Sequence, residues 1–162
     1  MARSRRSQFL ILIASIIICQ LAGVVGSIFT TPAIPTWYAG LNRPSLTPPN
    51  WLFAPVWTFL FLLMGISLFL VWRKSQPTAR RRLALSIFAI QLVLNVLWSL
   101  VFFGLRSPLG GLIVIGLLWV AILLTIVSFW KISKTASVLL LPYILWVSFA
   151  AILNSYLWKL NL

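Results

Sequence analysis

Acidic side chains and histidine are missing from this sequence of 162 residues, which contains no Asp, no Glu and no His. Without carboxylates or imidazoles the chain has no conventional general acid or base, and no group that could orient one in a catalytic triad. Cysteine is nearly missing too, because Cys19 is the single one. One thiol forms no internal disulfide and is too few for a metal site, so we expect no metal and no obligatory cofactor, and interpret Cys19 as a packing residue.

Charge is scarce and apolar sequence is abundant. Hydrophobic residues make up 62% of the chain and charged residues 8%, against roughly 45–50% and about 25% in soluble domains. Five uncharged stretches each match the roughly 20 residues that a helix needs to cross a bilayer. They are residues 9–29, 51–72, 83–103, 109–130 and 136–158. Since an isolated strand in lipid leaves its backbone unpaired, the sequence predicts an all-α integral membrane bundle of five transmembrane helices, forming a single domain over residues 1–162.

The 13 Lys and Arg residues cluster between these spans rather than on one basic face, which argues against nucleic acid as a partner. Ten would lie on one side of the membrane: Arg3, Arg5, Arg6, Arg73, Lys74, Arg80, Arg81, Arg82, Lys131 and Lys134. Arg43, Arg106 and Lys159 would lie on the other. The positive-inside rule predicts a cytoplasmic N-terminus and an external C-terminus, in a bacterial or cyanobacterial inner membrane. The inner cations are expected to attract anionic lipid head groups.

The first connection, residues 30–50, is rich in proline and aromatic residues. It holds Pro32, Pro35, Pro44, Pro48 and Pro49, with Trp37 and Tyr38 between them. Proline fixes φ and donates no hydrogen bond, so this segment is stiff. A loop of about 20 residues is either a lid over a binding site or a spacer resting on the membrane interface. Composition leaves both interpretations open.

Two further patterns concern helix packing. Small residues recur at every fourth position of the first span, at Ser15, Cys19, Gly23 and Ser27. This spacing lets another helix approach closely, inside one protomer or across a dimer. Pro142 lies inside the fifth span and is expected to bend it.

Four of the nine tryptophans lie too deep in the spans for an interfacial belt: Trp57, Trp98, Trp119 and Trp146. An indole N–H in hydrocarbon needs an acceptor, so these rings should face the interior, as core packing or around a ligand. Gln91, Asn95 and Ser99 share one face of the third span, and they either join helices or line a cavity. Asn154 raises the same question. Trp57, Trp98, Asn95 and Asn154 would gather in the outer half of the bundle beneath the loop, an arrangement that suits a flat, hydrophobic, partly polar ligand.

Several ordered motifs carry a family resemblance. Residues 37–49 read WYAGLNRPSLTPP and residues 51–57 read WLFAPVW, followed by QLVLN with Trp98, by FFGLR at 102–106, and by PYILW from Pro142 through Asn154. Together they resemble the tryptophan-rich sensory protein family, also called translocator protein or peripheral benzodiazepine receptor. The resemblance covers nearly the whole chain.

The resemblance implies a five-helix bundle, commonly a homodimer, with a pocket below the first loop. In the family this pocket binds porphyrins and, in some members, cholesterol and benzodiazepine-site ligands. Some bacterial members promote light- and oxygen-dependent breakdown of protoporphyrin IX with two pocket tryptophans, which match Trp57 and Trp146 here. With Trp37 of the loop, the candidate ligand-binding residues are Trp37, Phe53, Ala54, Trp57, Asn95, Trp98, Trp146 and Asn154.

The chain also departs from the family pattern. A cholesterol-recognition pattern is satisfied by Leu153, Tyr156 and Lys159, but Ser155 stands where animal members carry the central tyrosine, which argues against cholesterol. Leu46 and Gly110 replace aromatic residues, and Val114 replaces an acidic one. These changes predict a roomier pocket mouth with altered selectivity.

Function is therefore expected to be tetrapyrrole binding by a membrane receptor or sensor, with porphyrin, haem or bilin as the ligand. Haem iron usually takes a His, Cys, Met or Tyr ligand, and none is evidently placed here, so stacking on tryptophan should carry binding. Arg43 or Arg106 would pair with the propionates. The alternatives are a photo-oxidative porphyrin-degrading enzyme, with Trp57 and Trp146 as catalytic residues, and a transporter of tetrapyrroles or small solutes. No inverted repeats or broken helices support transport.

Overall fold

The computed structural model describes residues 4–74 and 78–162, so Arg3, counted among the cations above, lies outside the described residues. Within this part every regular element is helical: α1 (Arg5–Ala33), η1 (Tyr38–Gly40), α2 (Asn50–Trp72), α3 (Ala79–Ser99), η2 (Leu100–Gly104), α4 (Pro108–Trp130), α5 (Lys134–Val138) and α6 (Leu141–Leu160). Five of the helical stretches are long and apolar enough to cross a membrane. The predicted five-span all-α bundle is confirmed.

Side-chain caps begin several of these helices. The hydroxyl of Ser4 accepts a hydrogen bond from the Ser7 N–H at 3.2 Å at the start of α1. Ser107 does the same for Gly110 at 3.1 Å at the start of α4, where Pro108 occupies the first helical turn. A cap satisfies an N–H group that has no partner within the helix, and proline is tolerated there because its N–H would be unpaired anyway.

Helix α1 is longer than the sequence indicated, because it continues past residue 29 to Ala33 and includes Pro32. Proline removes one backbone hydrogen bond but fits a last turn, since no further turn has to follow it. The N–H of Ile34 still bonds the Thr30 carbonyl at 3.1 Å. The connecting loop is therefore shorter than the predicted 30–50 segment.

The fifth span is interrupted at the position where Pro142 predicted a bend. Its first part is the short helix α5, and α6 begins at Leu141 with Pro142 in its first turn. The Ser67 hydroxyl of α2 donates to the Ala136 carbonyl at 2.7 Å. This contact satisfies a polar group near the interruption, as hydrocarbon surroundings require.

Element η2 is a π-helical turn that ends the third span. The Leu105 N–H bonds the Leu100 carbonyl at 2.8 Å, five residues back. The wider turn places two neighbouring aromatic residues, Phe102 and Phe103, in the interior with ring centroids 4.8 Å apart. Such turns occur often at functional sites.

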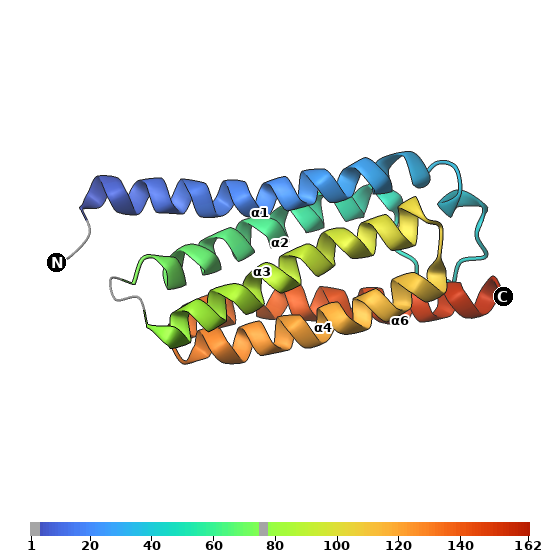
Figure 1. Ribbon diagram of the computed structural model, residues 1–162. Helices are drawn as coiled ribbons and strands as arrows, with labels where there is room; N and C mark the ends of the chain where they lie inside the picture. The colour runs from blue at the N-terminus through green and yellow to red at the C-terminus, as the bar shows by residue number, and fades with distance from the viewer. Residues whose placement is uncertain (1–3, 75–77) are drawn as a thin grey trace.

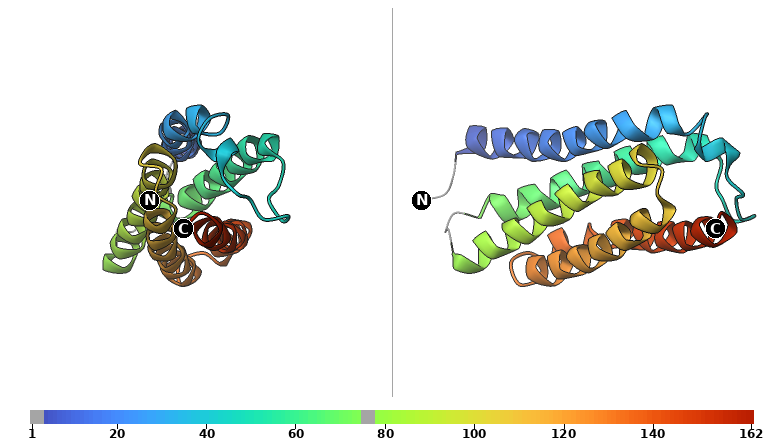
Figure 2. Two further views of the ribbon diagram at one scale, coloured as in Figure 1. Left: turned by 90° about the vertical axis from the view of Figure 1, so that its right-hand side faces the viewer. Right: turned by 45° about the vertical axis from the view of Figure 1, so that its right-hand side comes forward.

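The spans form one ring of near-parallel rods (Figure 1). Viewed from the end in Figure 2, the order around the ring is α1, α2, α6, α4 and α3. The start of α1, the end of α2 and the start of α3 lie at one end of the bundle, and the 34–49 loop and the C-terminus lie at the other. The described cations of the larger set are therefore gathered at one end.

Close packing between α1 and α2 depends on glycine. A Cβ on Gly65 would lie 2.7 Å from the backbone Cα of Ile16, and one on Gly23 would lie 2.7 Å from the Phe61 ring. Ser15 and Cys19, on the same stripe of α1 as Gly23, are fully buried. The inner part of the small-residue stripe thus packs inside the protomer, whereas Ser27 is exposed; Cys19 is a buried packing residue as predicted.

Candidate ligand pocket

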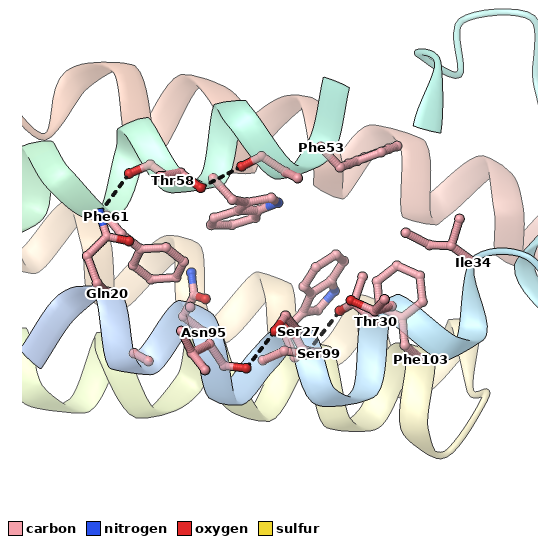
Figure 3. Close-up of a pocket in the computed structure, with 18 of the residues that line it drawn as sticks. Gln20, Ser27, Thr30, Ile34, Phe53, Thr58, Phe61, Asn95, Ser99 and Phe103 are labelled. Atoms are coloured by element: carbon pink, nitrogen blue, oxygen red, sulfur yellow. Dashed lines mark hydrogen bonds between the residues drawn. The ribbon is translucent and has the colours of Figure 1, made fainter. Parts of the chain in front are cut away.

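A cavity of about 270 Å³ lies between α1, α2 and α3 in the half of the bundle nearer the 34–49 loop. Figure 3 shows Phe53 and Ile34 at its outer end, and Phe61 and Gln20 at its inner end. Its lining is Gln20, Ala22, Gly23, Val24, Gly26, Ser27, Thr30, Thr31, Ile34, Asn50, Phe53, Ala54, Trp57, Thr58, Phe61, Asn95, Trp98, Ser99 and Phe103. No charged side chain belongs to this set.

Two indoles form the aromatic part of the wall. The rings of Trp57 and Trp98 lie 6.4 Å apart between centroids, at 31° to each other. The Trp98 N–H donates to the Asn154 Oδ1 at 3.3 Å, and the Asn154 amide donates to the Pro108 carbonyl at 2.7 Å. Trp98 is therefore held in place from α6. The Trp57 N–H has no hydrogen-bond partner among the described residues, which leaves it free for a ligand acceptor.

A buried hydrogen-bonded chain supports the pocket from behind. The Asn95 amide donates to the Tyr143 hydroxyl at 2.8 Å, which donates to the Gln91 Oε1 at 2.9 Å. The Tyr143 ring also meets Trp57 edge-on, at 6.3 Å between centroids. The polar face of the third span therefore has both of the roles left open above: it joins α3 to α6, and it contributes Asn95 to the cavity lining.

The walls from α1 and α2 carry hydroxyl groups that are already satisfied by their own helices. Thr30 donates to the Gly26 carbonyl at 3.1 Å, and Thr58 donates to the Ala54 carbonyl at 2.8 Å. Each oxygen keeps its lone pairs available as an acceptor. The Gln20 amide bridges to the Thr58 carbonyl at 3.1 Å at the inner end (Figure 3). The pocket lining is therefore uncharged and includes hydroxyl oxygens that can still accept hydrogen bonds.

The structure brings five of the eight candidate ligand-binding residues together in this lining: Phe53, Ala54, Trp57, Asn95 and Trp98. The other three do not belong to it. Asn154 lies behind Trp98, and Trp37 packs edge-on against Phe102 at 5.5 Å in the loop region. Trp146 contacts Phe53 at 6.3 Å, and its buried N–H has no partner among the described residues.

The 34–49 loop closes the outer end of the bundle. Tyr38, only 2% exposed, packs on Phe103 at 5.8 Å, and the Arg43 guanidinium lies 5.6 Å from the Tyr38 ring. Burial raises the pKa of the Tyr38 phenol, and the charge of Arg43 opposes this rise. The phenol therefore stays neutral at physiological pH.

Beside the loop lies a second, polar hollow, which touches the pocket at Asn50. Its lining is Leu41, Asn42, Arg43, Pro44, Thr47, Pro48, Pro49, Asn50 and Trp51. Arg106 borders neither cavity, and its backbone is left-handed with a φ of 53°. Arg43 is therefore the better placed of the two predicted propionate partners.

Other residues named from the sequence lie away from the pocket. Leu153 is buried whereas Tyr156 is 45% exposed, so the cholesterol pattern does not form one exposed surface. A Cβ on Gly110 would lie 2.8 Å from the Val101 side chain, so a small residue is needed there for packing. Leu46 is exposed on the loop.

Sequence reasoning missed the wall that α1 contributes. Gln20, Val24, Ser27 and Thr31 recur on one stripe of that helix and all line the cavity. The available signal was the run of small and polar residues in the first span. We interpreted it as helix packing alone.

Comparison with known proteins agrees with the fold and the motifs. The model of the TspO/MBR family matches residues 15–159. The chain belongs to the TspO/MBR family. It is 46% identical to the Tryptophan-rich protein TspO of Chlorobaculum tepidum over 95% of this chain and 98% of that protein. It is 48% identical to the protein of the same name from Archaeoglobus fulgidus, over 93% and 96%. It is 37% identical to the human Translocator protein, over 85% and 82%.

This TspO/MBR-family chain is an integral membrane protein, since family membership and the five apolar helices agree. Membership also supports a membrane sensor or receptor role. The ligand roles of individual residues stay predictions.

Proposed function

We propose that this protein is a membrane receptor that binds a tetrapyrrole (a porphyrin, haem or a bilin) in the pocket between α1, α2 and α3. The observation that supports this most strongly is the pair of indoles, Trp57 and Trp98, which lie side by side in the wall of a neutral cavity. Offset and tilted aromatic contacts favour a flat conjugated ligand. Because no charged residue lines the pocket, the pocket suits the apolar ring system of such a ligand better than its carboxylates.

The size of the pocket supports a ligand that is only partly enclosed. Its volume of about 270 Å³ is slightly below the roughly 300–1,000 Å³ of typical small-molecule sites. A tetrapyrrole would therefore extend beyond it. Because the polar hollow meets the pocket at Asn50, the propionates would reach Arg43 while the ring stays against Trp57.

Binding is a better proposal than degradation because the two tryptophans of the enzymatic alternative are separated. Trp57 lines the pocket, whereas Trp146 is outside its lining and packs edge-on against Phe53. We therefore assign Trp146 a supporting role next to the pocket wall.

The remaining proposals concern the surroundings of the protein. The described cations at the N-terminal end favour a cytoplasmic N-terminus and an external C-terminus in a bacterial inner membrane, next to anionic lipid head groups. The bulky apolar side chains exposed along α1, including Phe9, Leu21 and Ile28, face lipid or a second protomer of a homodimer.

Equilibrium binding of protoporphyrin IX, haemin and biliverdin to the protein in lipid nanodiscs tests the proposal. Substitution Trp57→Leu removes ring contact worth about 0.5–1.5 kcal/mol, so binding should weaken about 2- to 10-fold. Substitution Trp119→Leu is the matched control, because this indole lies outside the pocket and bonds Ser148. Equal affinities for the unmodified protein and the Trp57→Leu variant, or no binding of any of the three, would reject the assignment.

A further inference from the structure

The 34–49 loop, called the roof below, packs onto the outer end of the bundle. Between Ile34 and Asn50, none of the described loop residues lines the cavity. Tyr38 is inserted against the rings of Phe102 and Phe103, at 6.4 and 5.8 Å between centroids. Opening the roof would pull this side chain out of the bundle.

A polar clasp also holds the loop to the end of α6. The Asn42 N–H donates to the Asn161 Oδ1 at 2.9 Å, and the Asn161 amide donates to the Asn42 carbonyl at 3.0 Å. The Asn42 side chain adds a bond to the Leu160 carbonyl at 3.3 Å. A ligand that entered from above would have to break this clasp as well as move Tyr38.

The side of the pocket is open. Six lining residues are exposed and follow helical spacing along two facing helices. They are Val24, Ser27 and Thr31 on α1, and Asn50, Ala54 and Thr58 on α2. A residue that both lines a cavity and is exposed stands at its mouth. These six, called the rim below, border a slit between α1 and α2.

The rim differs chemically from its neighbours. Leu21 and Ile28 on α1 and Phe59 on α2 are bulky and more than half exposed, as expected of side chains that face lipid. Rim residues are smaller or polar. Their hydroxyls need no water, because Ser27 donates to the Val24 carbonyl at 2.7 Å and Thr58 to the Ala54 carbonyl at 2.8 Å.

The rim extends inward along both spans from their loop-side ends. At about 1.5 Å per residue, Thr58 lies about 12 Å along α2 from Asn50, and Val24 about 13 Å along α1 from Ala33. The inner part of the mouth therefore opens into acyl chains. At the inner end of the slit, the Gln20 amide fastens α1 to the Thr58 carbonyl.

We infer that the ligand enters and leaves through this slit, directly from the outer leaflet of the bilayer. The inference rests on the proposed function of the pocket and narrows its ligand class to molecules dissolved in the membrane. Such a ligand presents a flat neutral ring to the slit and keeps any carboxylate at the level of the head groups, near Arg43. On this route the 34–49 loop is a structural cover, and the rim is the gate through which the ligand passes.

Rates of protoporphyrin IX binding and release, measured by stopped-flow fluorescence with the ligand supplied in phosphatidylcholine vesicles, test the route. The double substitution Ser27→Phe/Thr58→Phe narrows the mouth. A narrower mouth raises the barrier to entry and to exit, so the association and dissociation rates should both fall about tenfold or more. Substitution Val24→Ala widens the mouth with little risk to folding and should raise both rates. The roof variant Asn161→Ala, which removes both clasp bonds to the Asn42 backbone, should leave both rates unchanged.

The outcomes separate the route from the function. If the unmodified protein binds but the rim variants leave both rates unchanged while the roof variant accelerates them, the ligand enters from above and the inference is wrong. If binding is intact but the rates respond to neither the rim nor the roof substitutions, a second protomer covers the slit or the ligand uses another path. Either result would also overturn the inference. Failure of the unmodified protein to bind would reject the pocket itself, and the route with it.

Discussion

At the scale of single residues, Tyr143 holds together the polar groups behind the pocket. It is fully buried, and its hydroxyl is the partner of two amides from another helix, Asn95 and Gln91. The Gln91 Nε2 is already without a partner among the described residues. Hydrocarbon surroundings make each further unpaired group costly, so this hydroxyl should matter for stability.

Substitution Tyr143→Phe removes the hydroxyl and keeps the ring. Because two buried amides lose their partner, the protein should be destabilised by about 1–3 kcal/mol, which thermal unfolding in detergent would detect. The control Tyr156→Phe changes a hydroxyl on a 45% exposed side chain and should have almost no effect. If the two variants unfolded at the same temperature, the buried chain would not contribute to stability.

Residue identity predicted the pocket in part. Indoles and amides too deep for the interface had to face inward, and Trp57, Trp98 and Asn95 do line the cavity. The sequence did not show that Trp146 would stay outside the lining and pack against Phe53, or that the Asn154 side chain would bond Trp98 and Pro108. Those outcomes depend on helix rotation by a fraction of a turn, which packing decides.

At the scale of helices, the spacing between α1 and α2 determines the shape of the pocket and of its mouth. Gly65 brings its backbone against Ile16 below the cavity, and Gly23 accommodates the Phe61 ring at the cavity's inner end. The Gln20 amide adds a bond across the same interface. These contacts hold the inner parts of the two helices together while their outer parts leave room for the cavity.

Substitution Gly65→Ala places a methyl group 2.7 Å from backbone that cannot rotate away. Overpacking of this kind typically costs about 1–3 kcal/mol, so the thermal unfolding midpoint in detergent should fall. The matched control is Gly116→Ala in α4, where a Cβ meets nothing within 4 Å. That variant should be neutral or slightly stabilised, since alanine favours helix more than glycine does. A lower midpoint for Gly116→Ala than for Gly65→Ala would contradict the packing account.

Helix number followed from hydropathy, but helix ends did not. The five uncharged stretches all became spans, because length and apolarity suffice for that. The first span was predicted to end at residue 29, but α1 continues to Ala33, because Pro32 fits its last turn. The π-helical turn η2 carries no evident sequence signal, since Phe102 and Phe103 would suit an ordinary helix equally well.

At the scale of the whole molecule, the candidate pocket lies in the half of the bundle that is nearer the 34–49 loop. The described cations at the N-terminal end, the closed loop at the other end and the cavity beneath it define one polarity across the membrane. Family membership supports a membrane sensor or receptor role, and the uncharged pocket with its two indoles supports the proposal that the ligand is flat.

A structure of the protein with protoporphyrin IX bound in lipid nanodiscs tests this account most directly. We expect the macrocycle between α1 and α2 with its face against Trp57, and its propionates directed toward Arg43. Ligand density on the outer perimeter of the bundle, with the cavity between α1, α2 and α3 left empty, would contradict it.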